Sequence, residues 1–367
     1  MNKMIIANLV HRPVRSVISI VAIAVEVTLI LVIVGLSVGM LRDSAERARG
    51  IGADVMVQPP GSSFLSGITG APAPIKIADV LRKQPHVAVV SPVITQLSTT
   101  GAVEVISGID LQSYEALGGP FTYLSGGPFQ HPDDMLVDDY IATSKNVKVG
   151  DTMDVLGHQA RICGIVLHGK GARKYLQLAT LQDWTGAQNK ASIFYVKADN
   201  PNNADLVMKE FQQIPGMQSY VMRTIQQYMS MMTATNMPGL STFINVVIGV
   251  ALIIGFIVIF QAMYTAVMER TREIGILKSL GASKMYIVNV ILRETLLLAI
   301  LGIALGIAIS FSAKAGLVRK FPLLPIMISG PWILRGTTIA VVGAMLGAIY
   351  PAFKAAQKDP IDALAYE

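Results

Sequence analysis

The sequence predicts an α-helical membrane protein with four transmembrane helices and a large α+β domain inserted between the first and second helices. Apolar residues make up 52% of the 367 residues and mean hydropathy is +0.52. Only 15% of the residues are charged, whereas soluble domains carry about 25%. The apolar residues concentrate in four long stretches, one near the amino terminus and three in the last third. Between the first and second stretches, short β-branched runs alternate with turn residues instead.

The first predicted transmembrane helix covers residues 17–40, which are apolar except for Glu26 and follow a basic amphipathic segment, residues 1–16. With a rise of about 1.5 Å per residue, such a helix reaches roughly 36 Å and crosses the hydrocarbon core of a bilayer. It is longer than the apolar core of a signal peptide, and no convincing small-residue cleavage site follows it. We therefore expect a retained anchor whose amino end lies in the cytoplasm.

Residues 41–240 are predicted to form an α+β domain outside the cytoplasm. Strand patterns separated by Gly, Pro, Asn and Asp cover residues 54–57, 87–90, 103–106, 161–166 and 193–196, and helical patterns cover 205–214 and 224–232. A segment of about 200 residues is long enough to bury its own core. Its Gly, Ser, Ala and Pro-rich stretch at 61–74 predicts a loop, either a surface linker or a contact for a substrate or partner.

Three further apolar stretches predict transmembrane helices at residues 241–267, 286–312 and 333–350. With the amino end inside, the loop 268–285 and the tail 351–367 lie in the cytoplasm, and the short loop 313–332 lies outside. The positive-inside rule agrees at the inner loop, which carries Arg270, Arg272, Lys278 and Lys284. Three basic residues in the outer loop, Lys314, Arg319 and Lys320, run against that rule.

No catalytic or metal site is predicted. Cys163 is the only cysteine, which excludes an intrachain disulfide and a zinc site built on cysteine pairs. The sequence has no Walker A motif, no Gly-x-Ser-x-Gly elbow and no His-Glu-x-x-His. The acidic group Asp133, Asp134, Asp138 and Asp139 is either a solvated turn or a calcium site, although its spacing does not match an EF-hand. The basic excess flanks apolar segments, so it indicates membrane topology and lipid attraction, with no nucleic acid as partner.

The loop at 268–285 contains the most informative stretch. Ile274, Leu277 and Leu280 recur every three residues among charged side chains, and Gly281 ends the pattern, so we expect a short amphipathic helix. From the residues alone, such a helix lies on the membrane surface or docks in the groove of a partner, and the two alternatives are equally supported.

The segment from Glu269 to Ser283, ERTREIGILKSLGAS, resembles the signature of the FtsX-like, MacB-like permease family of ABC transporters. The tail resembles it as well, in Tyr350-Pro351-Ala352, Ala355-Ala356, Asp359-Pro360-Ile361-Asp362-Ala363-Leu364 and Tyr366-Glu367. The order of one span, a large outer domain and three spans is also similar to that family. There the ATPase is either fused ahead of the first span or a separate subunit, and the short segment before residue 17 implies the separate-permease kind.

The resemblance implies a type VII ABC system in a bacterial cytoplasmic (inner) membrane, with both chain ends cytoplasmic and the large domain periplasmic or extracellular. Two ATPase subunits would hold ATP and Mg, with no cofactor bound directly to this chain and no enzyme activity of its own. A second permease copy or paralogue, membrane lipid, and in some systems a periplasmic adaptor and outer-membrane channel would be its other partners. ATP hydrolysis would move the outer domain by mechanotransmission.

The resemblance makes residues 268–283 the helix that couples to the ATPase, through Glu269, Arg270, Arg272, Glu273, Ile274, Leu277, Lys278 and Leu280. Residues 42–49 and 224–232 would be stalk helices below the outer domain. The substrate stays open among a drug, peptide, lipid, lipoprotein or haem. The alternative function is that of an FtsX-type signalling subunit, which activates extracytoplasmic hydrolases and transports nothing.

Within the spans, three pairs of glycines four residues apart predict close helix packing: Gly35 and Gly39, Gly302 and Gly306, Gly343 and Gly347. Glu26 is the one acid in mid-membrane and is an intramembrane candidate, either for a hydrogen bond between helices or for a ligand such as haem iron. Arg293 and Glu294 are expected to set the depth of the third span and to pair with the coupling region. The first helix is a candidate dimer interface.

Overall fold

The computed structural model describes residues 13–62, 71–98, 104–233 and 236–358, which fall into two compact units. The membrane unit takes in Met1–Gly39, Pro238–Arg319 and Ile326–Glu367, and the outer unit takes in Met40–Met237 and Lys320–Pro325. Residues 1–12 of the predicted amphipathic segment and the tail motif from Asp359 onward lie outside the described residues, as do 63–70 of the predicted loop.

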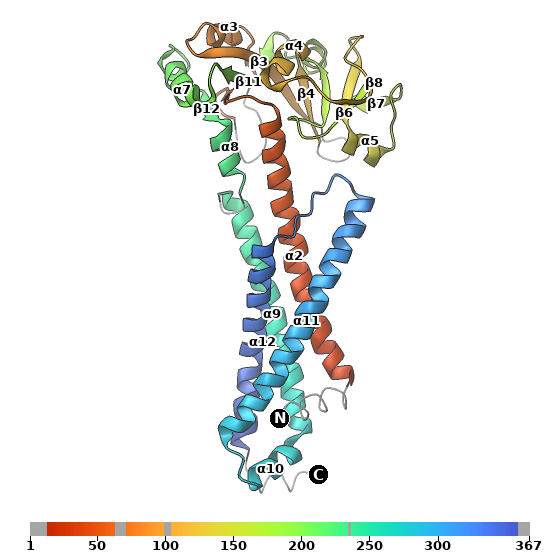
Figure 1. The fold of residues 1–367 in the computed structure, drawn as a ribbon, viewed down its shortest axis with the longest axis vertical. Helices are drawn as coiled ribbons and strands as arrows, with labels where there is room; N and C mark the ends of the chain where they lie inside the picture. The colour runs from red at the N-terminus through yellow and green to blue at the C-terminus, as the bar shows by residue number, and fades with distance from the viewer. Residues whose placement is uncertain (1–12, 63–70, 99–103, 234–235, 359–367) are drawn as a thin grey trace. The chain divides into compact units, whose positions relative to one another are not determined.

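The membrane unit is helical (Figure 1). Its elements are α2 (Pro13–Gly50), which continues into the outer unit, α9 (Pro238–Glu269), α10 (Thr271–Ser279), α11 (Lys284–Lys320) and α12 (Gly330–Gln357). In the described part of the chain, four helices are long and apolar enough to cross a membrane, and α10 is the short helix between the second and third of them. The fold class expected from the sequence is therefore confirmed.

The long helices extend past the boundaries drawn from hydropathy. Residues 313–320, expected in the outer loop, continue α11, so Lys314, Arg319 and Lys320 lie on its last turns. Residues 351–357, expected in the tail, continue α12 through Pro351. The reason is physical: hydropathy marks the part of a helix that matches the hydrocarbon core, whereas polar turns beyond it resemble a loop in sequence.

Small residues bring the membrane helices together. A Cβ atom added to Gly302 would lie 2.7 Å from Cβ of Ile23 on α2, and one added to Gly306 would lie 2.7 Å from the carbonyl oxygen of Ala24. A Cβ on Gly347 would lie 2.8 Å from the carbonyl oxygen of Phe256 on α9. Gly35 faces the backbone of Met327, and Gly39 is buried. Glycines of α11 and α12 thus contact neighbouring helices of the same chain.

The outer unit is built on a ten-stranded mixed sheet with the order β12-β1-β11-β3-β4-β9-β6-β8-β5, and β7 pairs with β8 (Figure 1). The strands are β1 (Val55–Gln58), β3 (Val87–Ser98), β4 (Glu104–Ile109), β5 (Tyr123–Gly126), β6 (Asp134–Asp138), β7 (Thr152–Val155), β8 (His158–Val166), β9 (Lys174–Gln177), β11 (Ile193–Ala198) and β12 (Val221–Thr224). A small second sheet pairs β2 (Ala73–Pro74) with β10 (Lys190–Ala191).

The outer unit also has short helices: α3 (Ile77–Arg82), α4 (Leu111–Gly118), α5 (Asp139–Lys145), α6 (Leu178–Trp184), α7 (Ala204–Gln213) and α8 (Ile225–Met231), with a 3₁₀ turn at Pro201–Asn203. Three apolar clusters form its core, around Phe194 and Phe211, around Ile162 and Leu176, and around Tyr114 and Tyr175. The helical patterns predicted at 205–214 and 224–232 correspond to α7 and α8. Because β1 follows α2 and pairs with β12, which precedes α8, the two chain segments that lead into the domain enter at neighbouring strands.

Replacing Gly306 by Ala is expected to lower the free energy of unfolding by about 1–3 kcal/mol, because the added methyl overlaps the backbone of α2. The matched control is Gly249→Ala on α9, where a Cβ meets nothing within 4 Å. The control is expected to be neutral or slightly stabilising, since Ala favours helix. Thermal unfolding of the full chain in detergent measures both variants, and equal midpoints would contradict the close contact of α11 with α2.

Candidate functional site

A buried ion-pair cluster joins three helices at the end of the bundle that carries α10. The Glu294 carboxylate on α11 accepts hydrogen bonds from Arg15 Nη2 on α2 at 3.0 Å and from Arg270 Nη1 at 3.1 Å. The Glu294 side chain is 3% exposed, and both arginines are largely buried. Arg270 lies at the break between α9 and α10. The expected pairing of Glu294 with the loop 268–285 is therefore found, through Arg270.

This cluster fixes the relative positions of the helices, because breaking one of its ion pairs costs free energy. A buried charge that loses its partner is strongly destabilising, by about 3–5 kcal/mol, because nothing replaces the lost solvation. Arg15 and Arg270 come from segments far apart in the chain and share one carboxylate, so neither helix shifts without disturbing the other. The start of α10 is thereby linked to α2 and α11.

One face of α10 packs against its own bundle. Ile274 is 8% exposed and belongs to the membrane core, and Leu277 packs against that core. A cavity of about 50 Å³ lies beneath the helix, lined among others by Met263, Val267, Ile274 and Glu294. Two of the three residues in the predicted stripe therefore face this chain, whereas we expected all three to be available to a partner's groove. The spacing identifies an apolar face, and only the fold decides what covers it.

The opposite face of α10 is open. Leu280 is 80% exposed, Ile276 is also exposed, and Arg272 and Glu273 are exposed beside them. Met285, at the start of α11, is a further exposed apolar side chain. We call Ile276, Leu280 and Met285 the α10 surface. Ile276 and Met285 were missed in the sequence because the period of three skips them.

Lys278 holds the far end of α10. Its Nζ donates to the carbonyl oxygen of Ala356 at 3.1 Å and to that of Lys358, at the last turn of α12. The last carbonyls of a helix have no partner within the helix, so an ammonium there satisfies an otherwise open acceptor. With Arg270 bound to Glu294 at one end and Lys278 bound to α12 at the other, α10 is fixed to the bundle at both ends.

Glu26 lies between glycines of two other helices. Its side chain is buried, and no hydrogen-bond partner reaches its Oε1 among the described residues. A Cβ added to Gly255 on α9 would lie 2.0 Å from Glu26 Oε2, and one added to Gly343 on α12 would lie 3.9 Å from Oε1. Gly255 makes room for the carboxyl group, whereas a Cβ at position 343 would be in ordinary van der Waals contact with it. The hydrogen bond between helices that we considered for Glu26 is not found in the described part of the chain.

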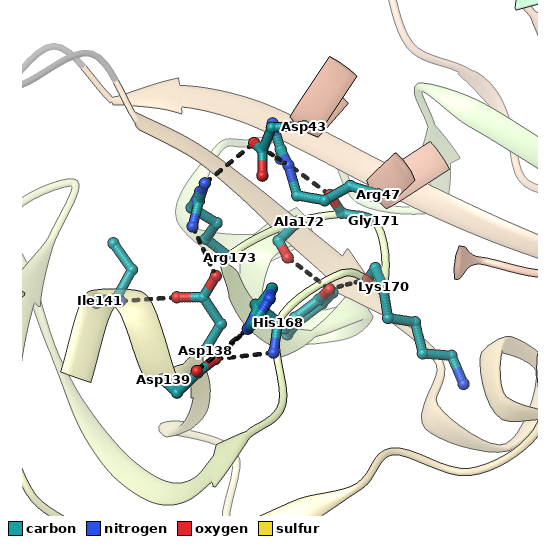
Figure 2. A network of polar contacts seen from close by, with 11 residues as sticks. Asp43, Arg47, Asp138, Asp139, Ile141, His168, Lys170, Gly171, Ala172 and Arg173 are labelled. Carbon is teal, nitrogen blue, oxygen red and sulfur yellow. Dashed lines mark hydrogen bonds and ion pairs between the residues drawn. The ribbon is translucent and has the colours of Figure 1, made fainter. Parts of the chain in front are cut away.

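A second ion-pair network lies within the outer unit, where α2 ends. Figure 2 shows Arg173 between two carboxylates: it donates to Asp43 Oδ2 on α2 at 3.0 Å and to Asp138 Oδ2 at 3.1 Å. Arg47, one turn beyond Asp43, donates to Asp43 at 3.0 Å and to the carbonyl oxygen of Gly171 at 3.0 Å. The end of α2 is thus tied to the segment 169–173 by charged groups.

Asp138 is the most buried member of this network. Its Oδ1 accepts from the backbone N–H of Ile141 at 2.7 Å, which caps the amino end of α5. Burial raises the pKa of this carboxyl, and the Ile141 amide and the Arg173 guanidinium oppose the rise by favouring the charged form. Arg173 therefore neutralises a carboxylate that also positions a helix.

Backbone packing closes the same junction. A Cβ on Gly50 would lie 1.7 Å from the carbonyl oxygen of Gly169, and one on Gly52, where φ is +81°, would lie 2.3 Å from Cα of Gly118. The hydroxyl groups of Tyr114 and Tyr175 both donate to the carbonyl oxygen of Lys170. Only glycine fits these contacts, so the last turn of α2 lies directly against the segment 169–173.

The acidic group that was considered for calcium is used by protein groups. Asp134 accepts from Arg161 and from the backbone N–H groups of Gln130 and His131. Asp138 binds Arg173, and Asp139 accepts from His168. Within the residues that the structure describes, no group of three His, Cys, Asp or Glu side chains is placed to hold a metal ion. The structure contradicts the interpretation as a solvated turn for Asp134 and Asp138, which are buried at the two ends of β6.

Two sequence profiles of known protein families match the chain. The sequence profile of the MacB-like periplasmic core domain matches residues 16–214, more than half of the chain. The profile of the FtsX-like permease C-terminal domain matches residues 245–360.

Individual relatives agree with these profiles. The uncharacterized ABC transporter permease YknZ of Bacillus subtilis is 38% identical over 128 residues, which cover 35% of this chain and 32% of YknZ. The macrolide export ATP-binding/permease protein MacB of Shewanella sp. is 24% identical over 394 residues, which cover 99% of this chain and 60% of that protein. The chain thus spans less than two thirds of each relative.

Among solved structures, the periplasmic region of MacB from Actinobacillus actinomycetemcomitans is similar with 17% identity and a TM-score of 0.38, covering 48% of this chain and 92% of that one. The extracellular domain of YknZ from Gram-positive bacteria is similar with 14% identity and a TM-score of 0.37, covering 47% of this chain and 99% of that one.

Replacing Glu294 by Ala is expected to lower the free energy of unfolding by about 3–5 kcal/mol, because two guanidinium groups stay buried without their shared carboxylate. The readout is the thermal unfolding midpoint of the full chain in detergent. Glu46→Ala is the control, since Glu46 forms an exposed pair with Arg42, for which a loss of at most about 1 kcal/mol is expected. Equal losses in the two variants would contradict the role given to the cluster.

Replacing Arg173 by Ala is expected to loosen the junction at the end of α2, because Asp43 and Asp138 lose the cation between them. Backbone hydrogen exchange, followed by mass spectrometry, should become faster by about ten-fold or more at residues 43–50 and 169–173, equivalent to ~1.4 kcal/mol. Arg82→Ala, which removes an exposed pair with Asp79, is the control and should leave these segments unchanged. Unaltered exchange in the Arg173 variant would show that packing alone holds the junction.

Proposed function

Because the chain belongs to the MacB/FtsX family of ABC transporter permeases, we propose that it couples ATP hydrolysis by a separate ATPase subunit to motion of its extracytoplasmic domain. This motion drives the export or extraction of a substrate, by mechanotransmission. The observation that carries the proposal is the placement of α10, which is anchored to the bundle at both ends and presents an exposed apolar face.

The α10 surface supplies the input of this mechanism. Leu280 and Ile276 are exposed apolar side chains with Arg272 and Glu273 beside them, a combination that suits a protein groove with a polar rim. An ATPase subunit that binds this face and changes conformation on hydrolysis would displace α10, and α10 is fixed to the bundle. Ile274 and Leu277 do not contact the ATPase in this scheme; they pack α10 against the apolar core of the membrane unit.

Helix α2 supplies the transmission. Arg15 near its beginning binds the shared carboxylate of Glu294, and Asp43 and Arg47 near its other end bind the outer unit. The helix runs without interruption from Pro13 to Gly50, so its backbone hydrogen bonds continue through all the residues between these anchors. A displacement of α10 would move α2 through the ion pairs of Glu294 with Arg270 and Arg15. The movement of α2 would then displace the outer domain through the ion pair of Asp43 with Arg173.

Several parts of this proposal come from the family. Two ATPase copies would carry ATP and Mg, and a second permease copy or paralogue would complete the membrane part. A periplasmic adaptor and an outer-membrane channel would be further partners. Four apolar helices and a periplasmic core domain fit an inner membrane protein. We place both chain ends in the cytoplasm, on the side of α10, where the ATPase has access.

The MacB-like core domain favours export over FtsX-type signalling to hydrolases.

The experiment is affinity purification of the full chain from its native host in mild detergent, with mass spectrometry of the proteins recovered. We expect an ATPase subunit with the wild-type chain and at least about ten-fold less of it with Leu280→Asp, equivalent to ~1.4 kcal/mol, because a buried carboxylate opposes docking. Thermal unfolding should be unchanged, since Leu280 is exposed.

Leu206→Asp is the matched control, because Leu206 is an exposed leucine on α7 of the outer unit. It should retain the ATPase at the wild-type level. Full recovery of the ATPase with Leu280→Asp would remove the α10 surface from the mechanism. Absence of any ATPase with the wild-type chain, under conditions that keep a known ABC complex intact, would overturn the proposed function itself. An outer protein recovered alongside separates the alternatives, since an adaptor indicates export and a hydrolase indicates signalling.

A further inference from the structure

An aromatic pocket lies on the outward faces of α9 and α12, apart from the cluster around Glu294. It has a volume of about 360 Å³ and is lined by Phe260, Tyr264, Tyr350 and Lys354. Phe256, Phe260 and Tyr264 are four residues apart on α9, and their rings stack with centroids 6.1 and 6.0 Å apart. The ring of Tyr350 on α12 lies 5.8 Å from that of Phe260. The result is an aromatic wall with one cation.

The cation is held by rings and a hydroxyl group. Lys354 Nζ lies 5.1 Å from the ring centroid of Tyr264 and 5.8 Å from that of Tyr350, and it donates to Tyr264 Oη at 3.4 Å. The negative π-faces of the rings attract the ammonium group electrostatically, and they leave N–H donors of Lys354 available for further hydrogen bonds. Among the described residues Lys354 has only Tyr264 and Tyr350 as electrostatic partners, with no carboxylate, and the lining residues include no acid. An anion at the mouth of the pocket would find an uncompensated positive charge.

The pocket lies near the ends of α9 and α12. Lys354 is in the last turn of α12, and Tyr264 is near the end of α9, so both are close to the helix ends that meet α10. Tyr and Lys at the ends of membrane helices lie at the level of the lipid headgroups. Beside the pocket, α12 exposes Leu346, Ile349 and Phe353, which offer an apolar surface to acyl chains.

We propose that this pocket binds an anionic phospholipid from the leaflet on the α10 side, with the phosphate at Lys354 and Tyr264. The Tyr264 hydroxyl donates to a phosphate oxygen, the ammonium group supplies the opposite charge, and the rings of Phe260 and Tyr350 contact the glycerol and the first methylenes. The inference requires only that the helices lie in a membrane, so it stands apart from the proposed function.

The test uses the purified full chain reconstituted in nanodiscs of phosphatidylcholine and phosphatidylglycerol. Lipids that remain bound after transfer to detergent are counted by native mass spectrometry. Lys354→Gln is expected to lower the bound phosphatidylglycerol about five-fold, equivalent to ~1 kcal/mol for one basic residue at an anionic surface, and to leave phosphatidylcholine unchanged. Lys354→Arg should keep the lipid, since charge and reach are retained. Lys314→Gln, a half-buried lysine on α11, is the matched control and should have no effect.

Four outcomes would overturn the inference. Equal retention of phosphatidylglycerol in Lys354→Gln, in a variant that unfolds at the wild-type temperature, shows that the lipid does not bind here. Equal losses in Lys354→Gln and Lys314→Gln indicate a general charge effect. Release of the bound lipid by millimolar inorganic phosphate indicates a site for free anions, and a second copy of the chain found crosslinked through Tyr350 shows that protein covers this face.

Discussion

The shared carboxylate of Glu294 is the interaction on which the membrane unit depends most. It is buried, and it compensates two arginines that come from the start of α2 and from the break between α9 and α10. A buried ion pair adds little net stability compared with apolar packing, but removing one partner is costly, so the cluster mainly specifies where helices lie. The arrangement of α10, including its exposed face, follows from this constraint together with the bond from Lys278 to the end of α12.

The same physical device appears at the other end of α2. Arg173 is shared by Asp43 and Asp138 in the way that Glu294 is shared by Arg15 and Arg270, and the backbone contacts at Gly50 and Gly52 leave no space for a side chain. A helix that is fixed by buried charges at both ends is suited to transmit displacement rather than absorb it. This arrangement supports our proposal that α2 transmits displacement, in a chain that belongs to a family of ABC transporter permeases.

Between these anchors, close contact depends on residues without side chains. Gly302 and Gly306 let α11 approach the backbone of α2, and Gly255 leaves space for the carboxyl group of Glu26. In a membrane, where apolar burial drives helices together only weakly, such contacts supply packing. The outward faces are covered by larger apolar and aromatic side chains, and the pocket around Lys354 lies among them.

The sequence by itself determined the four spans, the strands β1, β3, β4, β8 and β11, the helices α7 and α8, and a short amphipathic helix at α10, because hydropathy and periodicity are properties of neighbouring residues. The other short strands and helices of the outer domain were not predicted. It left the polar ends of α11 and α12 undetected, since helix outside the hydrocarbon core carries no apolar signal. Tertiary structure alone decided that Ile274 and Leu277 face the bundle while Leu280 is exposed. It also decided the partners of Glu294 and Asp43, which are separated from Arg15 and Arg173 by 279 and 130 positions. Pairs so distant are set by how the whole chain packs, and no local pattern encodes them.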